Sequence, residues 1–159
     1  MTWPEPVERV AAFLRAAAAE ARVEEFAERT STAAEAAERV GCPLSAIVKS
    51  LLFVCDGRPV LALVPGDRRA DPAKVAAAVQ SERARVAGPD ELERAIGFPP
   101  GAVAPFPLPA VERVLLDSSL LGQELVWIGA GSTRHMAGLP PAELCRLTRA
   151  QPLDISTGD

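Results

Sequence analysis

The spacing of apolar and polar positions divides the chain into segments that predict helices and strands in mixed order. Apolar residues recur at helical spacing from Pro6 to Ala21, which predicts an amphipathic first helix. The same reasoning predicts further helices at residues 32–40, 72–79, 89–96 and 140–149. Strand-forming stretches predict strands at residues 23–26, 47–55, 59–64, 114–117 and 125–128, and a short strand or ordered tail at 153–155.

Turn and capping residues support these boundaries. Thr32-Ala33-Ala34-Glu35 matches a capping box, and Gly41 tolerates the positive φ that ends a helix. Asp56-Gly57 is a tight-turn pair, so the strands on either side of it are predicted to form a hairpin. Asp71-Pro72 supplies an N-cap and a proline at the first helical position, and Gly97 closes the helix before it. Because helices and strands interleave around a hairpin, we predict a mixed α/β fold and not a doubly wound parallel sheet.

Composition limits the size, compartment and partners of the protein. A chain of 159 residues is long enough for one core, so we expect a single domain over residues 1–159. No apolar run is long enough to cross a membrane, and the start Met1-Thr2-Trp3-Pro4-Glu5 has no secretory signal pattern, so we expect a cytoplasmic protein. The net charge of −4 argues against DNA binding or any broad, non-specific nucleic-acid contact. A local contact with one exposed end of a nucleic acid remains compatible with it.

The few histidines and cysteines exclude several kinds of site. Cys42, Cys55 and Cys145 are widely spaced and form no C-x-x-C pair, so we expect reduced thiols. His135 is the single histidine, which excludes zinc sites built on several histidines, and we expect no metal and no cofactor. A Ser-His-Asp arrangement would need His135 with Ser132 and Asp117, but no G-x-S-x-G motif supports it. Asp117 is more typical of a cap for the turn at 118–123.

One lysine stands out in the predicted strand at 47–55. Only Lys49 and Lys74 of the seventeen basic residues are lysine, so arginine is used almost everywhere that either cation would serve. In an apolar strand, Lys49 indicates that a compact ammonium is needed beside a ligand, or that its protonation state changes. The structural alternative is a strand-end lysine whose ammonium reaches water. We expect Lys74 to be solvated.

Two glycine-containing loops are candidates for close backbone approach to a ligand. Gly129-x-Gly131 follows a strand but lacks the third glycine, helix and acidic residue of a dinucleotide fingerprint. Its amides are still able to approach an anion or a carbonyl oxygen, although a simple turn explains it equally well. The loop at 97–109 offers the same possibility at Gly101. Its wall is stiffened by Pro99, Pro100, Pro105, Pro107 and Pro109.

The order of these segments resembles the YbaK and prolyl-tRNA-synthetase-associated editing-domain family over roughly Thr30 to Ile155. The resemblance begins with Thr32-x-x-Glu35-Ala36-Ala37, Ile47-Val48-Lys49-Ser50-Leu51 and Pro65-Gly66-Asp67. Gly97-Phe98-Pro99-Pro100-Gly101-Ala102-Val103-Ala104-Pro105 is similar to the family's G-[YF]-x-x-G-x-V-x-P loop, with Ala102 where a second glycine is common. It continues in order with Leu116-Asp117 to Leu120, Gly129 to Gly131, and Pro141-Ala142-Glu143-Leu144-x-Arg146-Leu147-Thr148.

The resemblance implies a fold, an activity and a set of roles. Family members hydrolyse aminoacyl-tRNA that carries the wrong amino acid, on a mixed sheet that is partly closed like a barrel and surrounded by helices. Lys49 matches the functional lysine at the acylated 3′ end, and Gly101 matches the glycine whose amide helps to hold the ester or its oxyanion. The implied substrate-binding residues are Thr32, Ser50, Asp67, Gly129, Gly131, Ser132 and His135. Residues 132–136 match no specificity pattern that identifies the amino acid.

The resemblance predicts a trans-editing deacylase that removes cysteine, alanine or a similar small amino acid from tRNA for proline. An aminoacyl ester is already activated, so positioning and carbonyl polarisation suffice, and a cysteinyl thiol is able to attack its own carbonyl. We favour a charged Lys49 over a neutral proton acceptor because nothing in the sequence supplies a second cation beside it. The expected partners are the acceptor end of aminoacyl-tRNA and a synthetase, either prolyl-tRNA synthetase or another one. Contact with tRNA is expected through a small basic patch, such as Arg58, Arg68, Arg69 and Arg134, or through a partner synthetase.

Two other functions remain open from the residues. The first is a non-catalytic module of the same fold that binds an aminoacyl or nucleotide end, or a synthetase, and the acidic net charge is its main support. The second is a hydrolase of small esters or thioesters.

Overall fold

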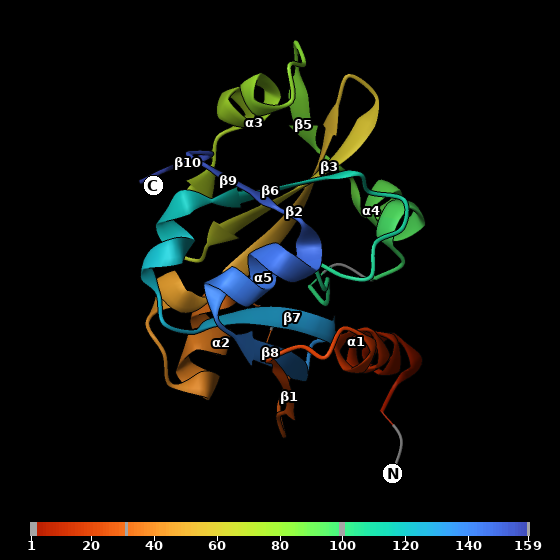
Figure 1. The fold of residues 1–159 in the computed structure, drawn as a ribbon, viewed down its shortest axis with the longest axis vertical. Coiled ribbons are helices and arrows are strands. Elements are labelled where there is room, and N and C mark those ends of the chain that lie inside the picture. The colour runs from red at the N-terminus through yellow and green to blue at the C-terminus, as the bar shows by residue number, and fades with distance from the viewer. Residues whose placement is uncertain (1–2, 31, 99–100, 159) are drawn as a thin grey trace.

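The computed structural model describes residues 3–30, 32–98 and 101–158, and Figure 1 shows how their helices and strands are arranged. The helices are α1 (Glu5–Ala16), α2 (Ala33–Val40), α3 (Pro72–Ala78), α4 (Pro89–Ile96) and α5 (Pro141–Thr148), with 3-10 turns at Leu44–Ala46 and Ser118–Gly122. The strands are β1 (Arg22–Glu25), β2 (Val48–Cys55), β3 (Arg58–Pro65), β4 (Arg69–Ala70), β5 (Ala84–Val86), β6 (Arg113–Asp117), β7 (Val126–Ser132), β8 (His135–Leu139), β9 (Gln151–Leu153) and β10 (Ser156–Thr157). The predicted mixed α/β class is confirmed.

The strands form one large mixed sheet, one small antiparallel sheet and a two-stranded ribbon. The large sheet has the order β5-β2-β3-β6-β9, in which β2 is antiparallel to both its neighbours and β6 is parallel to β3 and β9. The small sheet has the order β1-β8-β7, and β4 pairs with β10. A parallel bridge between Ile47 and Trp127 links the two larger sheets. Within the described ranges no pairing closes them into a barrel.

The β2–β3 hairpin forms as the sequence predicts. Asp56 and Gly57 have φ of 50° and 84°, so both central residues of the turn are left-handed, as in the tight turns that suit twisted strands. Along β3, Leu61 and Leu63 pack on one face of the sheet, whereas Val60 and Ala62 pack on the other. Because both faces of β3 are covered, the strand reads as a continuous apolar run.

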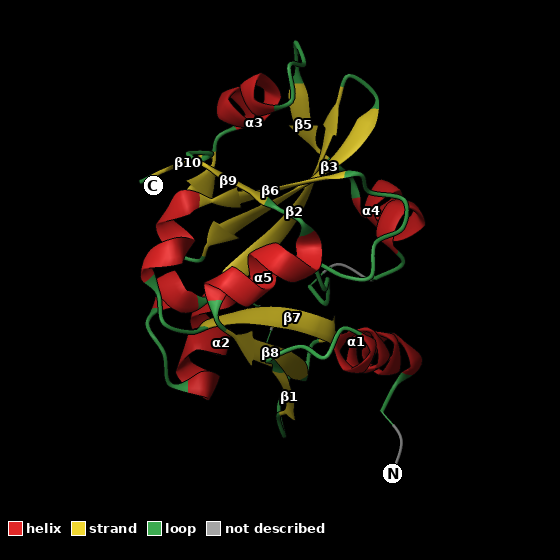
Figure 2. Ribbon diagram, viewed as in Figure 1, coloured by secondary structure: helices red, strands yellow, loops and turns green. Residues whose placement is uncertain are grey.

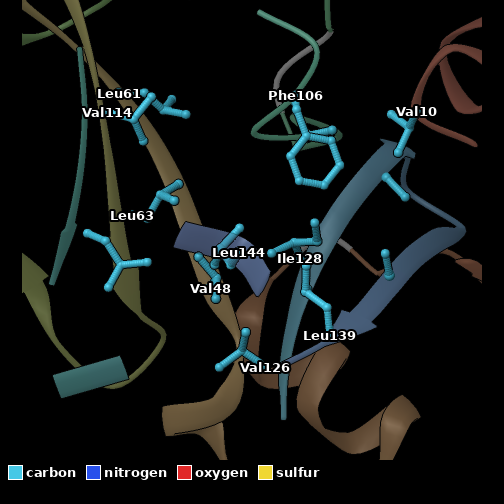
Figure 3. Packing of buried hydrophobic residues seen from close by; sticks show 14 of the residues in the cluster. Val10, Val48, Leu61, Leu63, Phe106, Val114, Val126, Ile128, Leu139 and Leu144 are labelled. Atoms are coloured by element: carbon cyan, nitrogen blue, oxygen red, sulfur yellow. The ribbon is translucent and has the colours of Figure 1, made fainter. Parts of the chain in front are cut away.

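The main core lies between the two larger sheets. Figure 3 shows Val48 and Leu63 of the large sheet facing Ile128 and Leu139 of the small one, with Leu144 of α5 between them. Figure 2 shows α5 lying across this region, while α1 packs at the far end of β7. A second cluster covers the other face of the large sheet beneath α3, and its members include Val60, Ala62, Val75, Val79, Leu115 and Ile155.

The largest departure from the sequence prediction follows Ile128. The segment from Gly129 to His135 is predicted as a loop, but β7 continues to Ser132 and β8 begins at His135. β8 contains two small residues, Ala137 and Gly138, which weaken its strand signal. The Trp127 ring packs closely against Gly138, where an added Cβ would lie 3.0 Å from that ring, so a larger residue would need the ring to shift.

Smaller differences concern element ends. The first helix stops at Ala16 and not at Ala21, because the chain turns at residues 17–19 with Ala18 at a φ of 49° and then enters β1. β1 is the predicted edge strand, since it pairs only with β8. Strands β4, β5 and β10 are two or three residues long, too short to give a periodic signal. Pro99 and Pro100, predicted to stiffen the loop at 97–109, lie outside the described residues.

Candidate functional site

Lys49 lies near the start of β2, where the large sheet opens beside the small one. It pairs with Val64 of β3, and its Nζ donates a hydrogen bond of 2.6 Å to the main-chain oxygen of Arg68. The predicted strand is apolar on both faces, yet Lys49, Ser50 and Leu51 are only half-buried. These three residues line a pocket, so the lysine is set in a concave surface of the protein and is not simply at a strand end.

The surroundings of Lys49 change its ionisation. Burial lowers the pKa of the ammonium from 10.5, the nearby positive charge of Arg69 lowers it further, and the carboxylate of Asp67 opposes both effects. The preference for a charged Lys49 rested on the expectation that no cation lies beside it. That expectation is wrong, because β4 brings Arg69 close to the ammonium.

The pocket has a volume of about 350 Å³ and is lined by residues from α2, β2, the 101–103 segment, β7 and β8. It brings together seven of the nine residues that the sequence singles out, namely Thr32, Lys49, Ser50, Gly101, Gly129, Ser132 and His135. Small and apolar side chains complete the wall, among them Ala33, Ala36, Ile47, Val103 and Met136. Segments distant in sequence therefore converge on the start of β2.

The two candidate glycines at the pocket are favoured for different reasons, one for its backbone conformation and the other for close packing. Gly101 is exposed with a φ of 82°, and a Cβ there would meet only Thr133, at 4.0 Å. Its left-handed backbone, more than crowding, therefore favours glycine. Gly129 is required for close packing, since a Cβ would lie 2.4 Å from the main-chain oxygen of Val103. The 101–103 segment is thus seated directly on the backbone of β7.

Gly131 and Asp67 do not line the pocket. Gly131 has a φ of 100°, and its added Cβ would lie 2.8 Å from the carbonyl group of Pro6 at the start of α1. This glycine allows α1 to pack on β7. Asp67 is exposed and acts on Lys49 only through its charge. Neither residue is part of the site proposed below.

His135 is buried at the pocket wall in a polar array that includes a carboxylate. Its Nδ1 lies 2.6 Å from Ser132 Oγ, which also accepts the Arg134 amide at 3.0 Å. Because Oγ accepts that amide, its hydroxyl proton is best placed towards Nδ1, which leaves the ring proton on Nε2. Nε2 faces Glu25 Oε2 at 3.6 Å, and the Trp3 ring packs edge-on at 5.4 Å between centroids. Burial lowers the pKa of His135, against the effect of Glu25.

Sequence reasoning missed Glu25 and Trp3 as neighbours of the histidine. Glu25 lies directly opposite His135 in the pairing of β1 with β8. Since β8 was not predicted, nothing in the sequence indicated this cross-strand pair. A strand prediction at 135–139 would have made a cross-strand neighbour of His135 expected, but its identity depends on the register with β1.

Ser50 carries an unusual buried hydroxyl. Its Oγ is inaccessible to solvent and has no hydrogen-bond partner in the part of the chain that the structure describes. Buried hydroxyl groups nearly always have a partner, so an orphaned one at a pocket wall needs an explanation. A bound molecule would supply the missing partner only if the pocket wall moved to expose Oγ.

Other candidate residues have structural roles. Asp117 is buried away from the pocket and accepts hydrogen bonds from Ser119 Oγ and from the amide of Ile155, so it caps the chain there. Lys74 pairs with Asp154 at 3.0 Å and is not simply solvated. Arg58 lies at the hairpin end of β3, hydrogen-bonded to Ser81, and is not beside Arg69. The prediction that four arginines form one basic patch is therefore wrong, because Arg58 lies apart from Arg69.

Two kinds of feature are absent from the described part of the chain. Among residues 3–30, 32–98 and 101–158, no group of three or more histidine, cysteine or carboxylate side chains is placed to hold a metal ion. None of the helices in these ranges is long and apolar enough to span a bilayer.

Comparison with known proteins decides the family. Residues 27–147 match the family model described as the aminoacyl-tRNA editing domain. The chain belongs to the aminoacyl-tRNA editing domain family. The resemblance to YbaK-type editing domains is thereby confirmed. A solved structure of a proposed trans-editing enzyme for prolyl-tRNA synthetase matches with a TM-score of 0.92 and 35% identity, covering 99% of this chain and 100% of that one.

Curated relatives include synthetases and a protein of similar size. The proline–tRNA ligase of Nitratidesulfovibrio vulgaris strain Hildenborough is 37% identical over 99 residues, which is 62% of this chain but 17% of the ligase. An uncharacterised protein of Bacillus subtilis strain 168, YwhH, is 36% identical over 77% of this chain and 78% of its own length. This chain thus spans under a fifth of the ligase, and matches YwhH over most of both chains.

Proposed function

We propose that this protein hydrolyses the ester bond of misacylated aminoacyl-tRNA, acting in trans in the cytoplasm. The observation that carries the proposal is the convergence of Lys49, Gly101 and Gly129 on one pocket in a member of the editing-domain family. The proposed substrate is tRNA for proline, or a tRNA with a similar acceptor end, that carries cysteine, alanine or a similar small amino acid. The match to proline–tRNA ligases motivates the choice of tRNA.

The proposed chemistry relies on positioning and electrostatic stabilisation. An aminoacyl ester is an activated acyl group, so water needs an oriented, polarised carbonyl more than it needs a protein nucleophile. Lys49 is held at the pocket wall by Arg68, where its ammonium would orient the terminal ribose or the ester carbonyl. The amide of Gly101 would hold the oxyanion as it forms. Ser132 Oγ, which lies 2.6 Å from His135 Nδ1, would contact the aminoacyl or ribose hydroxyl and amino groups. Ser50 Oγ, which no solvent reaches in this structure, would join them after a shift of the pocket wall.

The lining of the pocket, more than its volume, bears on the size of the amino acid. A volume of about 350 Å³ is within the usual range for ligand pockets and does not by itself exclude a large side chain. Part of its wall is formed by Ala33 and Ala36 on α2, facing Ile47, Val103 and Met136. A short aliphatic or thiol side chain would bury its surface against these groups, whereas a large aromatic side chain would require them to move.

The test is a deacylation panel. Release of the amino acid would be measured from cysteinyl-, alanyl-, seryl- and prolyl-tRNA with the wild type, Lys49→Ala and Arg94→Ala. Arg94 is an exposed cation on α4 outside the pocket lining, so its variant is a matched control for loss of charge. We expect a loss on the order of a hundredfold or more for Lys49→Ala, as when one oxyanion donor is removed, and no change for Arg94→Ala. Equal rates in the wild type and Lys49→Ala would contradict the assigned role.

A second candidate is a non-catalytic module that binds an aminoacyl end or a partner synthetase, and the net charge of −4 favours it. Tight binding of aminoacyl-tRNA without faster ester release across all twenty amino acids would support this function over the first. Turnover of small esters that lack tRNA would instead support a small-molecule hydrolase.

A further inference from the structure

The segment Asp154–Thr157, called the clamp segment below, lies against the residues that hold Lys49. Its strand β10 pairs with β4, with Ser156 opposite Ala70. The amide of Asp71 donates to the oxygen of Ile155 at 2.9 Å. Ile155 and Ser156 are completely buried. Figure 1 shows the chain running from β9 directly into β10 along the edge of the large sheet.

Arg68 joins the clamp segment to the lysine. Its Nε donates to Ser156 Oγ at 2.6 Å, and its Nη2 lies 3.4 Å from the Ser156 oxygen. The main-chain oxygen of the same arginine accepts the hydrogen bond from Lys49 Nζ at 2.6 Å. The side chain of Arg68 is therefore held by the clamp segment, and its main-chain oxygen binds the ammonium of Lys49.

The clamp segment is itself anchored at several points. The buried carboxylate of Asp117 accepts the amide of Ile155 at 3.1 Å. Lys74 donates to the Ser156 oxygen at 2.9 Å and pairs with Asp154. The family model matches residues 27–147, so the whole clamp segment lies outside the region by which the family was assigned. Its contact with the Lys49 acceptor is a feature that the family match does not describe.

We propose that Ser156 and the Arg68 side chain are positioning residues for Lys49. By fixing the Arg68 guanidinium, Ser156 holds the Arg68 main-chain oxygen at the place from which it orients the ammonium into the pocket. Without Ser156 Oγ the 68–69 turn gains freedom, and Lys49 loses its fixed acceptor and becomes more hydrated. This inference rests on the proposed function for its effect on catalysis, but its effect on Lys49 itself does not depend on any activity.

The chain offers a direct probe because it contains only two lysines. With lysine labelled by ¹³C at Cε, the protein gives two side-chain signals, and Lys74→Arg identifies the one from Lys49. The variants are Ser156→Ala, which changes no charge, and Arg68→Met, which keeps the backbone acceptor. Ser81→Ala is the matched control, because it removes a serine hydroxyl that accepts from Arg58 at 3.0 Å at the hairpin end of β3, away from Arg68 and Ser156.

We expect the Lys49 signal of the wild type to titrate below free lysine and to show two inequivalent Hε protons, as for a fixed side chain. In Ser156→Ala and in Arg68→Met the Hε protons become equivalent, as for a side chain that rotates freely. Ser81→Ala leaves the titration and the Hε signals of Lys49 unchanged. Ester release falls on the order of tenfold or more in the first two variants, mainly through kcat, because a small misplacement at a reacting centre is costly.

The outcomes separate this inference from the proposed function. An unchanged Lys49 signal in both Ser156→Ala and Arg68→Met overturns the positioning role, whatever the activity. A changed signal in a protein whose wild type releases no amino acid from any tRNA supports the positioning role and contradicts the deacylase. If Ser156→Ala does not fold, Arg68→Met decides alone. In folded variants, the double variant Arg68→Met/Ser156→Ala should release the amino acid no more slowly than Arg68→Met alone, because both substitutions remove the same contact between Arg68 and Ser156.

Discussion

Two residues at the pocket have polar groups whose burial opposes folding. Lys49 is partly desolvated beside another cation, and Ser50 has a buried hydroxyl without a partner among the described residues. Burying polar groups without full compensation opposes folding, and such groups gather where a protein binds or reacts with a ligand. Lys49 and Ser50 are therefore better explained by the proposed function than by the stability of the fold.

Ser50→Ala tests this separation. Because Oγ has no hydrogen-bond partner among residues 3–30, 32–98 and 101–158, its removal relieves a desolvation cost, and we expect stability to stay within about 1 kcal/mol of the wild type or to rise. Ester release should fall, since the hydroxyl is proposed to contact the substrate. Urea denaturation and the deacylation panel measure the two effects. A loss of stability with unaltered turnover would show that Ser50 serves the fold.

His135 gives a pH-dependent prediction. Burial lowers its pKa in the folded protein from 6.5, so below that pH the unfolded chain binds a proton that the folded chain takes up less readily. The stability that neutral His135 contributes is therefore present above pH 6.5 and is lost as the pH falls through the folded pKa.

His135→Gln should lose less stability than the wild type between about pH 7 and pH 5, because glutamine takes up no proton. Urea titrations of both proteins across this range provide the comparison. Parallel pH profiles for the two proteins would mean that the histidine is not desolvated.

At the scale of elements, the pocket depends on how closely the 101–103 segment sits on β7. The contact between Val103 and Gly129 is backbone against backbone, so neither side has a flexible side chain that is able to yield. Extended β7 and the left-handed Gly101 together define one wall. The wall is thus set by the approach of two main chains.

Gly129→Ala should displace the 101–103 segment. A Cβ at 2.4 Å from the Val103 oxygen forces a backbone shift, and we expect a destabilisation of about 1–3 kcal/mol together with a loss of ester release. Gly122→Ala is the matched control, because nothing lies within 4 Å of its added Cβ. Thermal unfolding and the deacylation panel report the two effects. Equal behaviour of the two variants would argue against the close packing.

For the whole molecule, a net charge of −4 must be reconciled with a polyanionic substrate. Arg69 interacts electrostatically with Lys49, and Arg134 with His135, so each lies close to a residue of the pocket. Both arginines are exposed. They are the proposed local contacts with the phosphates of an acceptor end.

Salt dependence tests these two arginines. Each phosphate contact contributes a slope of roughly −0.7 to −0.9 in log affinity against log salt. Arg69→Ala and Arg134→Ala should each reduce the slope for tRNA binding by about one such contact. Arg94→Ala, which removes a cation from α4, should leave it unchanged. Affinity of the wild type that does not vary with salt would contradict direct phosphate contact.

Several elements of the fold can be predicted from local sequence. The hairpin follows from Asp56-Gly57, the helix ends from Thr32, Gly41, Asp71 and Gly97, and β3 from its unbroken apolar run. The family follows from the order of short motifs around Lys49. These features depend on neighbours in the chain, so the sequence alone determines them.

Only the tertiary structure decides which residues meet. It excludes Asp67 and Gly131 from the pocket, places Arg69 beside Lys49 and Glu25 opposite His135, and ties Ser156 to the acceptor of the lysine through Arg68. These relations depend on strand pairing between distant segments, above all β1 with β8 and β4 with β10. Short strands with small or polar residues carry little periodic signal, and their register is fixed by packing across the whole molecule.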